Sequence, residues 1–133
     1  MKNMLVVTSG IVAMILSTST IASPREDLLA QYAAAAKVTS FSAARGQALH
    51  TQSSSGGKPD TPSCTTCHGK DTRSAGRALT GKTIEPVAVS VTPTRYTDPA
   101  KVEKWFKRNC TEVLGRECTP QEKGDWLTFV IGQ

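Results

Sequence analysis

Large apolar side chains are scarce in most of this chain, and their scarcity limits what it can fold into. In residues 23–133, only 18 of 111 residues are Leu, Ile, Val or Phe, a share of about 16%. Chains below roughly 20% begin to resemble disordered proteins, and a chain this short buries little surface in any case. We therefore expect a cofactor, a metal or disulfides to supply part of the interior. A large multidomain enzyme, a membrane channel and a well-filled two-layer fold are excluded.

The first 22 residues have the pattern of an export signal. Lys2 precedes an apolar run over residues 5–16, and mostly small residues follow it. We predict a signal peptide over 1–22 with cleavage after Ala22 (Ser23 being the less favoured site), a periplasmic location, and no membrane span after its removal. A membrane anchor is the alternative, but the run is shorter than the roughly 20 apolar residues that a spanning helix needs.

The remaining chain carries a mild basic excess, with 15 Lys and Arg against 11 Asp and Glu, a net charge of +4. No basic run is interleaved with aromatic residues, so we expect no nucleic-acid partner. The densest basic group has helical spacing and fits either a solvated helix face or a docking rim for an acidic partner. It comprises Lys101, Lys104, Lys107 and Arg108.

Capping residues and periodicity predict four helices and no strand-rich region. The first covers 25–37 behind Ser23 and Pro24, and the second covers about 42–50. Asp98 opens a third that Gly115 ends, and Thr119 opens a fourth with Glu122 completing a capping box. The predicted apolar faces are Leu28, Leu29 and Tyr32; Phe41, Ala44, Ala48 and Leu49; Val102, Trp105, Phe106, Asn109, Cys110 and Val113; and Trp126, Leu127, Val130 and Ile131.

Two long segments between these helices have loop composition. Residues 52–62 are rich in Ser, Gly and Pro, and residues 69–97 are punctuated by Gly and Pro. Val87, Val89 and Val91 alternate, but no second strand-like run is present to pair with them. We predict a small all-α domain over 23–133 in which long loops wrap around whatever fills the centre.

The motif that carries chemistry is Cys64-Thr65-Thr66-Cys67-His68, the attachment signature of a c-type haem. Two thiols add to the haem vinyl groups, the two intervening residues set the reach between them, and the adjacent His offers a proximal ligand to iron. Cys64, Cys67 and His68 are therefore predicted to hold one covalently attached haem c. Export and the thin core both agree with this prediction.

Three other uses of the cysteines compete with haem attachment. A thioredoxin-like redox pair requires a βαβ context that is absent here. A zinc site built from Cys64, Cys67, Cys110 and Cys118 would need a shorter spacing within its second pair. Two ordinary disulfides are the third alternative. For Cys110 and Cys118 themselves, an oxidising compartment makes pairing the default, either as a plain staple or as a redox-sensitive hinge.

The second iron ligand is not a methionine, because Met1, Met4 and Met14 all lie in the predicted signal. The candidates are His50, a lysine, an oxygen ligand such as Asn109, or none. We expect His50 to be a partly exposed polar residue at the end of its helix, although it could fold back over the haem. Asn109 lies on a predicted apolar face, where a buried amide needs a partner, either iron or a hydrogen bond within the core.

Several segments together resemble the sphaeroides haem protein family, the SHP-type cytochromes c. They are YTDPAKVEKWFKRNC over 96–110, GRECT over 115–119, FSAARG over 41–46 and GGKP over 56–59. The step of 41 residues from His68 to Asn109 also agrees with the family pattern. The resemblance covers nearly all of 23–133.

This resemblance implies a class I cytochrome c-like fold with His68 as the proximal iron ligand. It also implies Asn109 as the distal ligand of the oxidised state and a Cys110–Cys118 disulfide beside it. Members release the Asn on reduction, bind small diatomics such as oxygen or nitric oxide, and are associated with a dihaem cytochrome c as electron donor. We thus expect a gas-binding electron-transfer protein more than an enzyme. A bis-His shuttle using His50, or a weak oxygen or peroxide reductase, is the alternative.

Overall fold

The computed structural model describes residues 22–133, so the predicted signal peptide lies outside the described residues except for Ala22. Within this range the chain forms five helices and one pair of short strands. In order, these are α1 (Pro24–Ala36), α2 (Ala43–Thr51), α3 (Thr65–His68), β1 (Gly76–Arg77), β2 (Thr83–Ile84), α4 (Pro99–Leu114) and α5 (Pro120–Ile131). The prediction of an all-α class with long loops is confirmed.

The long helices begin at the capping residues that the sequence predicts. Ser23 and Glu26 form a capping box at the start of α1, and Thr119 and Glu122 form another at the start of α5. The Asp98 carboxylate accepts the Lys101 N–H at 3.1 Å at the start of α4. These side chains accept N–H groups that the first helical turn leaves without a partner, so local chemistry alone accounts for the helix starts.

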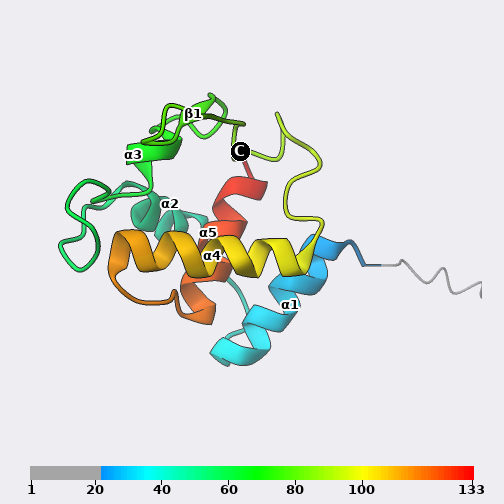
Figure 1. Cartoon of the computed structure of the whole chain (residues 1–133). Helices are drawn as coiled ribbons and strands as arrows, with labels where there is room; N and C mark the ends of the chain where they lie inside the picture. The colour runs from blue at the N-terminus through cyan, green and yellow to red at the C-terminus, as the bar shows by residue number, and fades with distance from the viewer. Residues whose placement is uncertain (1–21) are drawn as a thin grey trace, which may run out of the picture.

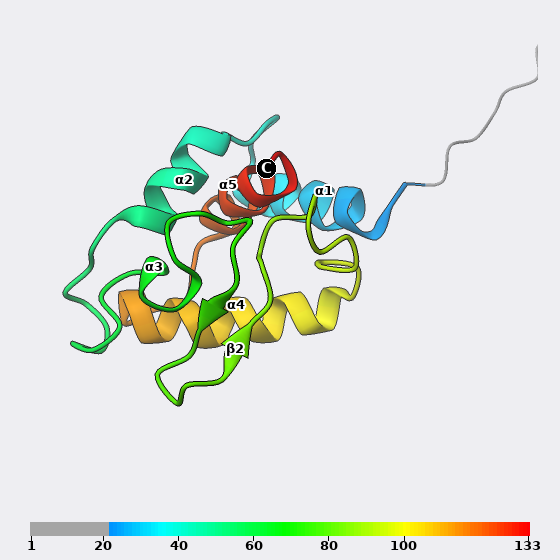
Figure 2. The same cartoon turned by 90° about the horizontal axis from the view of Figure 1, so that it is seen from above.

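Helix α5 is the element around which the others are arranged. Both α1 and α2 pack closely on it, and α4 crosses in front of it in Figure 1. The segment that carries α3 and β1 lies above these helices in Figure 1, and the view from above shows it beside α2 and over α4 (Figure 2). The short attachment helix is thus placed between two longer helices that come from distant parts of the sequence.

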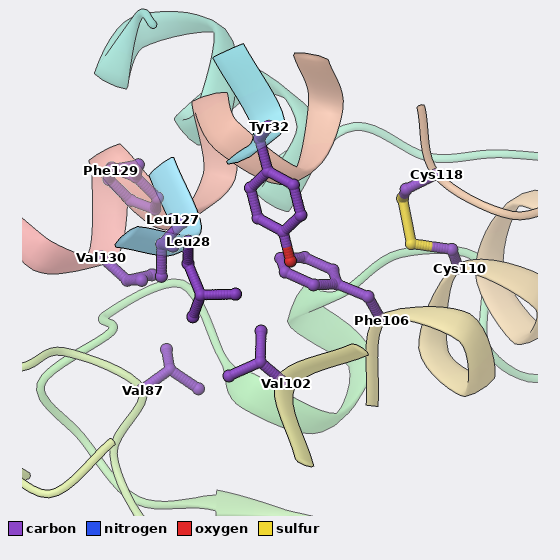
Figure 3. Close-up of a cluster of buried hydrophobic side chains, with 10 residues drawn as sticks. All are labelled: Leu28, Tyr32, Val87, Val102, Phe106, Cys110, Cys118, Leu127, Phe129 and Val130. Carbon is purple, nitrogen blue, oxygen red and sulfur yellow. A yellow bond between two sulfur atoms is a disulfide. The ribbon is translucent and has the colours of Figure 1, made fainter. Parts of the chain in front are cut away.

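One cluster of buried side chains joins α1, α4 and α5 (Figure 3). Helix α4 contributes one stripe of residues to it, at the spacing that an amphipathic helix predicts. The members of the cluster are Leu28, Tyr32, Val87, Val102, Phe106, Cys110, Cys118, Leu127, Phe129 and Val130. The Tyr32 and Phe106 rings meet edge to face with centroids 6.2 Å apart, which ties α1 to α4.

The predicted buried face of α2 is only partly correct, because Phe41 packs against the core and Leu49 is partly buried, but the two alanines do not follow. Ala44 and Ala48 are exposed, and the buried residues of this helix are Gly46 and His50. A Cβ atom at Gly46 would lie 2.1 Å from the backbone oxygen of Asp125 in α5. The backbones of the two helices therefore lie in direct contact. The face of α2 that meets α5 is set by the glycine, which has no side chain, and not by hydrophobic residues.

The predicted face of α4 is only partly correct. Val102, Phe106, Cys110 and Val113 are buried, whereas Trp105 is 43% exposed and Asn109 is only partly buried. Trp105 and Asn109 are four residues apart and so lie one above the other along the helix. They lie at the edge of the apolar stripe of α4, where the other helices do not bury them.

The segment over 69–97 is irregular apart from the two short strands, which pair antiparallel with Gly76 opposite Ile84. The alternating valines do not form a strand: Val87 is buried and Val91 is exposed. Val89 donates its N–H to the Val130 carbonyl at 3.1 Å, which fastens this segment to the end of α5. None of the helices described in 22–133 has the length and hydropathy to cross a membrane.

Candidate haem site

The predicted attachment motif forms a single helical turn. Cys64 lies at the N-terminal end of α3, Cys67 and His68 lie within it, and Gly69 ends it with a φ of +71°. Neither cysteine is part of a disulfide, and both are partly buried. Burial raises the pKa of the Cys64 thiol to about 11. The turn brings both thiols and the imidazole to one short element, as the spacing predicts.

His68 has the character that an iron ligand requires. Burial, with smaller effects from nearby His50 and Arg95, lowers its pKa to about 4, so the ring is neutral at pH 7. Its Nδ1 atom is buried and, among the described residues, has no hydrogen-bond partner. The other ring nitrogen, Nε2, would be the one offered to a haem iron. Two free thiols with an adjacent neutral imidazole are the donor set that a covalent haem needs, and the site fits that group.

The four cysteines do not gather into one site. Cys110 and Cys118 are joined through sulfur with a Cα–Cα distance of 5.5 Å, while Cys64 and Cys67 stay free on α3. Within residues 22–133 no group of three or more His, Cys, Asp or Glu side chains is placed to share a metal ion. The arrangement does not support the alternative of a four-cysteine zinc site.

The expectation that His50 is partly exposed is wrong. This residue is 0% exposed, and its ring packs against Trp126 and Phe129 of α5 with centroid distances of 6.3 and 5.8 Å. Its Nε2 lies 2.9 Å from the Gly69 carbonyl oxygen, and its Nδ1 lies 3.3 Å from the Trp126 indole Nε1. Both ring nitrogens are occupied by protein groups, because two partners distant in sequence converge on a helix-end histidine.

Asn109 lies in α4, directly before Cys110. It is partly buried, and no hydrogen bond engages its side-chain amide within the part of the chain that the structure describes. Its neighbour one turn earlier, Trp105, lies under the Arg108 guanidinium, whose carbon is 5.4 Å from the ring centroid. This edge of α4 therefore presents an indole and a free amide side by side.

The end of α4 that carries Asn109 is held by the loop over 52–62. Lys58 donates its N–H to the Glu112 carbonyl at 2.7 Å. A Cβ atom at Gly57 would lie 2.1 Å from that same Glu112 oxygen, so the loop backbone lies directly against the last turn of the helix. The Cys110–Cys118 link secures the same turn from its other side. The turn of α4 that follows Asn109 is thus held by the loop that leads into the cysteine motif.

Three residues near the attachment segment or its neighbour His50 were not predicted as site residues. Trp126 and Gly69 bind the two ring nitrogens of His50, and Arg95 is close enough to His68 to lower its pKa. The one signal in the sequence was Trp126, since a buried indole N–H usually finds an acceptor. Nothing in the sequence identifies His50, 76 residues away, as the acceptor for this indole.

Residues 36–130 match a family described as a domain of unknown function, DUF1924. The chain is 56% identical over 106 residues to the cytochrome c-type protein SHP of Cereibacter sphaeroides, an alignment that covers 80% of this chain and 81% of that protein. The chain belongs to the SHP-type family of c-type cytochromes. As a member of this family it carries one covalently attached haem c.

Solved structures agree with the family assignment. The oxidised form of SHP, described as an oxygen-binding cytochrome c, superimposes with a TM-score of 0.80 at 53% identity, covering 84% of this chain and 98% of that one. Oxidised cytochrome c'' of Methylophilus methylotrophus superimposes with a TM-score of 0.69 at 27% identity, covering 83% and 94%. Members of the SHP-type family and cytochrome c'' thus share the class I-like helical arrangement found here.

Proposed function

We propose that this SHP-type cytochrome is a periplasmic protein whose iron is held by His68 and Asn109 when oxidised. On reduction Asn109 would dissociate, and the iron would then bind a small diatomic such as oxygen or nitric oxide. The observation that carries this proposal is the contrast between two side chains. The Asn109 amide is free of hydrogen bonds within the described chain, whereas both nitrogens of His50 are engaged.

The attachment segment would supply the fixed half of the site. Cys64 and Cys67 would hold the haem through thioethers, and His68 would offer Nε2 as the proximal ligand. The haem supplies an iron that changes oxidation state and takes ligands on two sides. Because the pKa of His68 is lowered to about 4, the imidazole keeps its lone pair available over the physiological pH range.

Asn109 would supply the releasable half. An amide oxygen is a hard, neutral donor that suits ferric iron moderately and ferrous iron poorly. Reduction would therefore weaken the bond between Asn109 and the iron. Once released, the amide stays close enough to donate or accept a hydrogen bond, and the polarity of the distal side helps to decide between gas binding and electron transfer.

His50 is less suited to the distal position. It is the only other histidine in the chain, and it is fully buried between α2 and α5. To bind iron it would have to give up its bond to Gly69 or to Trp126. Each lost bond would leave a buried polar group without a partner, at a cost of about 1–3 kcal/mol. The geometry therefore favours Asn109 over a bis-His arrangement.

The relatives support the remaining parts of the proposal. The C. sphaeroides protein is described as oxygen-binding, and cytochrome c'' of M. methylotrophus has been studied for haem-ligand detachment. By the family resemblance, a dihaem cytochrome c would be the electron donor. An exported chain also meets the oxidising conditions under which Cys110 and Cys118 would form their disulfide.

Optical spectra of Asn109→Ala test the proposal. The ferric spectrum of this variant should lose the signature of six-coordinate iron that the wild type shows, while both ferrous proteins bind carbon monoxide. Thr111→Ala is the matched control, because Thr111 is exposed on the same helix and its hydroxyl bonds only the Lys107 carbonyl. A wild-type ferrous protein that stays six-coordinate and ignores carbon monoxide would contradict the proposal, as would an Asn109→Ala spectrum identical to that of the wild type.

A further inference from the structure

His50 is a buried histidine that the proposed ligand set does not use, and its tautomer can be assigned. The indole Nε1 of Trp126 carries a hydrogen and can only donate, so the Nδ1 of His50 must accept from it at 3.3 Å. The ring proton therefore lies on Nε2, which donates to the Gly69 carbonyl oxygen at 2.9 Å. A chain of two hydrogen bonds thus runs from α5 through α2 to the residue that follows His68.

Gly69, the residue that receives this chain of bonds, is otherwise open to solvent. Gly69 is exposed and has a φ of +71°, and a Cβ atom placed on it would meet nothing within 4 Å. Its own N–H closes the turn of α3 by bonding the Thr65 carbonyl at 2.9 Å. The bond from His50 is the link that connects the Gly69 carbonyl to the buried core.

The ring of His68 lacks the usual device for orienting a metal-bound histidine. Such residues generally donate their second ring N–H to a carboxylate, a carbonyl or water, which fixes the ring and tunes its basicity. Here Nδ1 of His68 is buried without a hydrogen-bond partner among the described residues. The ring of His50 lies close by, with centroids 6.4 Å apart and planes inclined by 34°.

We propose that His50 is a positioning residue for His68. By holding the Gly69 carbonyl, and by packing beside the ring, it sets the orientation of the imidazole in place of a direct hydrogen bond to Nδ1. His50 touches neither the iron nor the gas in this arrangement. The inference rests on the proposed role of His68 as the proximal ligand. In it, His50 acts on His68 through the hydrogen bond to the Gly69 carbonyl.

Resonance Raman spectra of the haem-loaded ferrous protein test this assignment, because the iron–histidine stretching band reports the orientation and basicity of the proximal ring. His50→Phe keeps a ring but removes both hydrogen bonds, so its band should shift and broaden. His50→Gln can donate to Gly69 and accept from Trp126 through one amide, so its band should return toward the wild-type position. The midpoint reduction potential should follow the same order.

Two further variants separate positioning from general destabilisation. Trp126→Phe leaves His50 in place but removes the donor that selects its tautomer, so the band should broaden even if His50→Phe fails to fold. Leu28→Ala removes a fully buried side chain of α1. It should lower the denaturant midpoint of unfolding and leave the band where it is.

The outcomes separate this inference from the function on which it rests. If the wild-type ferrous protein shows no iron–histidine band, the proposed function is wrong, because either His68 does not bind the iron or the ferrous iron stays six-coordinate. If that band is present but stays unchanged in His50→Phe or in Trp126→Phe, only the positioning role is overturned. A band displaced as far by Leu28→Ala as by His50→Phe would overturn it too.

Discussion

Arg45 and Asp125 form a bidentate ion pair that joins α2 to α5, with Nε–Oδ2 and Nη2–Oδ1 distances of 2.7 and 2.9 Å. The Asp125 side chain is 5% exposed, and it also accepts the backbone N–H of Ser42, the N-cap of α2, at 2.7 Å. One carboxylate therefore fixes both the start and the first turn of the helix that carries His50.

Removing this carboxylate should destabilise the protein more than removing its partner. Asp125→Ala leaves the Ser42 N–H and the guanidinium without their acceptor, and we expect the free energy of unfolding to fall by about 1–3 kcal/mol. Arg45→Ala should cost less, because the Arg45 side chain is more than half exposed and the carboxylate keeps its bond to Ser42. Urea unfolding of the two haem-loaded variants checks the order; an equal loss in both would contradict it.

A side chain at Gly46 should separate α2 from α5. Ala is the better helix former, by up to about 1 kcal/mol, but at this position its Cβ would lie 2.1 Å from the Asp125 backbone oxygen. We expect Gly46→Ala to lower stability by about 1–3 kcal/mol, the usual cost of overpacking. Ala48→Gly, at an exposed position of the same helix, should cost only about 0.5–1 kcal/mol. Thermal unfolding distinguishes the two, and a stabilised Gly46→Ala would show that the helices can part without cost.

Gly57→Ala should act on the site itself. The added Cβ would lie 2.1 Å from the Glu112 carbonyl oxygen, so the loop and the last turn of α4 must move apart. Because Asn109 is one turn away, we expect the ferric absorption spectrum to shift toward that of Asn109→Ala. Gly132→Ala is the control, since its Cβ comes no closer than 3.4 Å to any group. Identical ferric spectra for Gly57→Ala and wild type would contradict the idea that the loop over 52–62 positions this part of α4.

Loss of the Cys110–Cys118 disulfide should lower stability measurably. The two residues are 8 positions apart, and closing so short a loop stabilises by about 2–3 kcal/mol on the chain-entropy account. The Cys110→Ser/Cys118→Ser double variant should lose about that amount in urea unfolding. Wild type treated with a thiol reductant should behave in the same way, and a reductant that leaves wild-type unfolding unchanged would indicate that the pair is not bonded.

The link between Arg116 and Glu122 predicts a pH dependence. The guanidinium, helped by the N-terminal turn of α5, lowers the pKa of Glu122 below its ordinary value of 4.5. A carboxyl whose pKa is lowered by folding stabilises the fold above its unfolded pKa, and that contribution is lost as the pH falls through the folded value. Since Arg116 is half exposed, the effect should be modest, about 0.5–1 kcal/mol.

Glu122→Gln measures this contribution. The difference in unfolding free energy between wild type and variant should be constant above about pH 5 and shrink toward zero at lower pH. Asp27→Asn, an exposed carboxyl in the first turn of α1, is a control for general effects of removing a negative charge. A difference that grows as the pH falls would have the wrong sign and would contradict the role assigned to Arg116.

The helix starts, the attachment motif and the family could all be predicted from the sequence. Ser23, Asp98 and Thr119 begin helices through bonds to N–H groups at most three residues away, so a local pattern is sufficient to locate them. The motif ending in His68 is equally local, since covalent attachment of a haem requires its residues to be nearly contiguous. For the same reason a sequence comparison finds the family directly.

The buried faces of the helices and the contacts of His50 could not be predicted, because they depend on how distant parts of the chain pack together. Hydrophobic periodicity predicts that the alanines of α2 face the core. Instead Gly46 lies against α5, because the two backbones come too close there for a side chain to fit. His50 and Asp125 are polar, and both are buried because their partners come from distant parts of the chain. A buried polar group is tolerated only when its bonds are satisfied, and those bonds form between residues that the fold alone brings together.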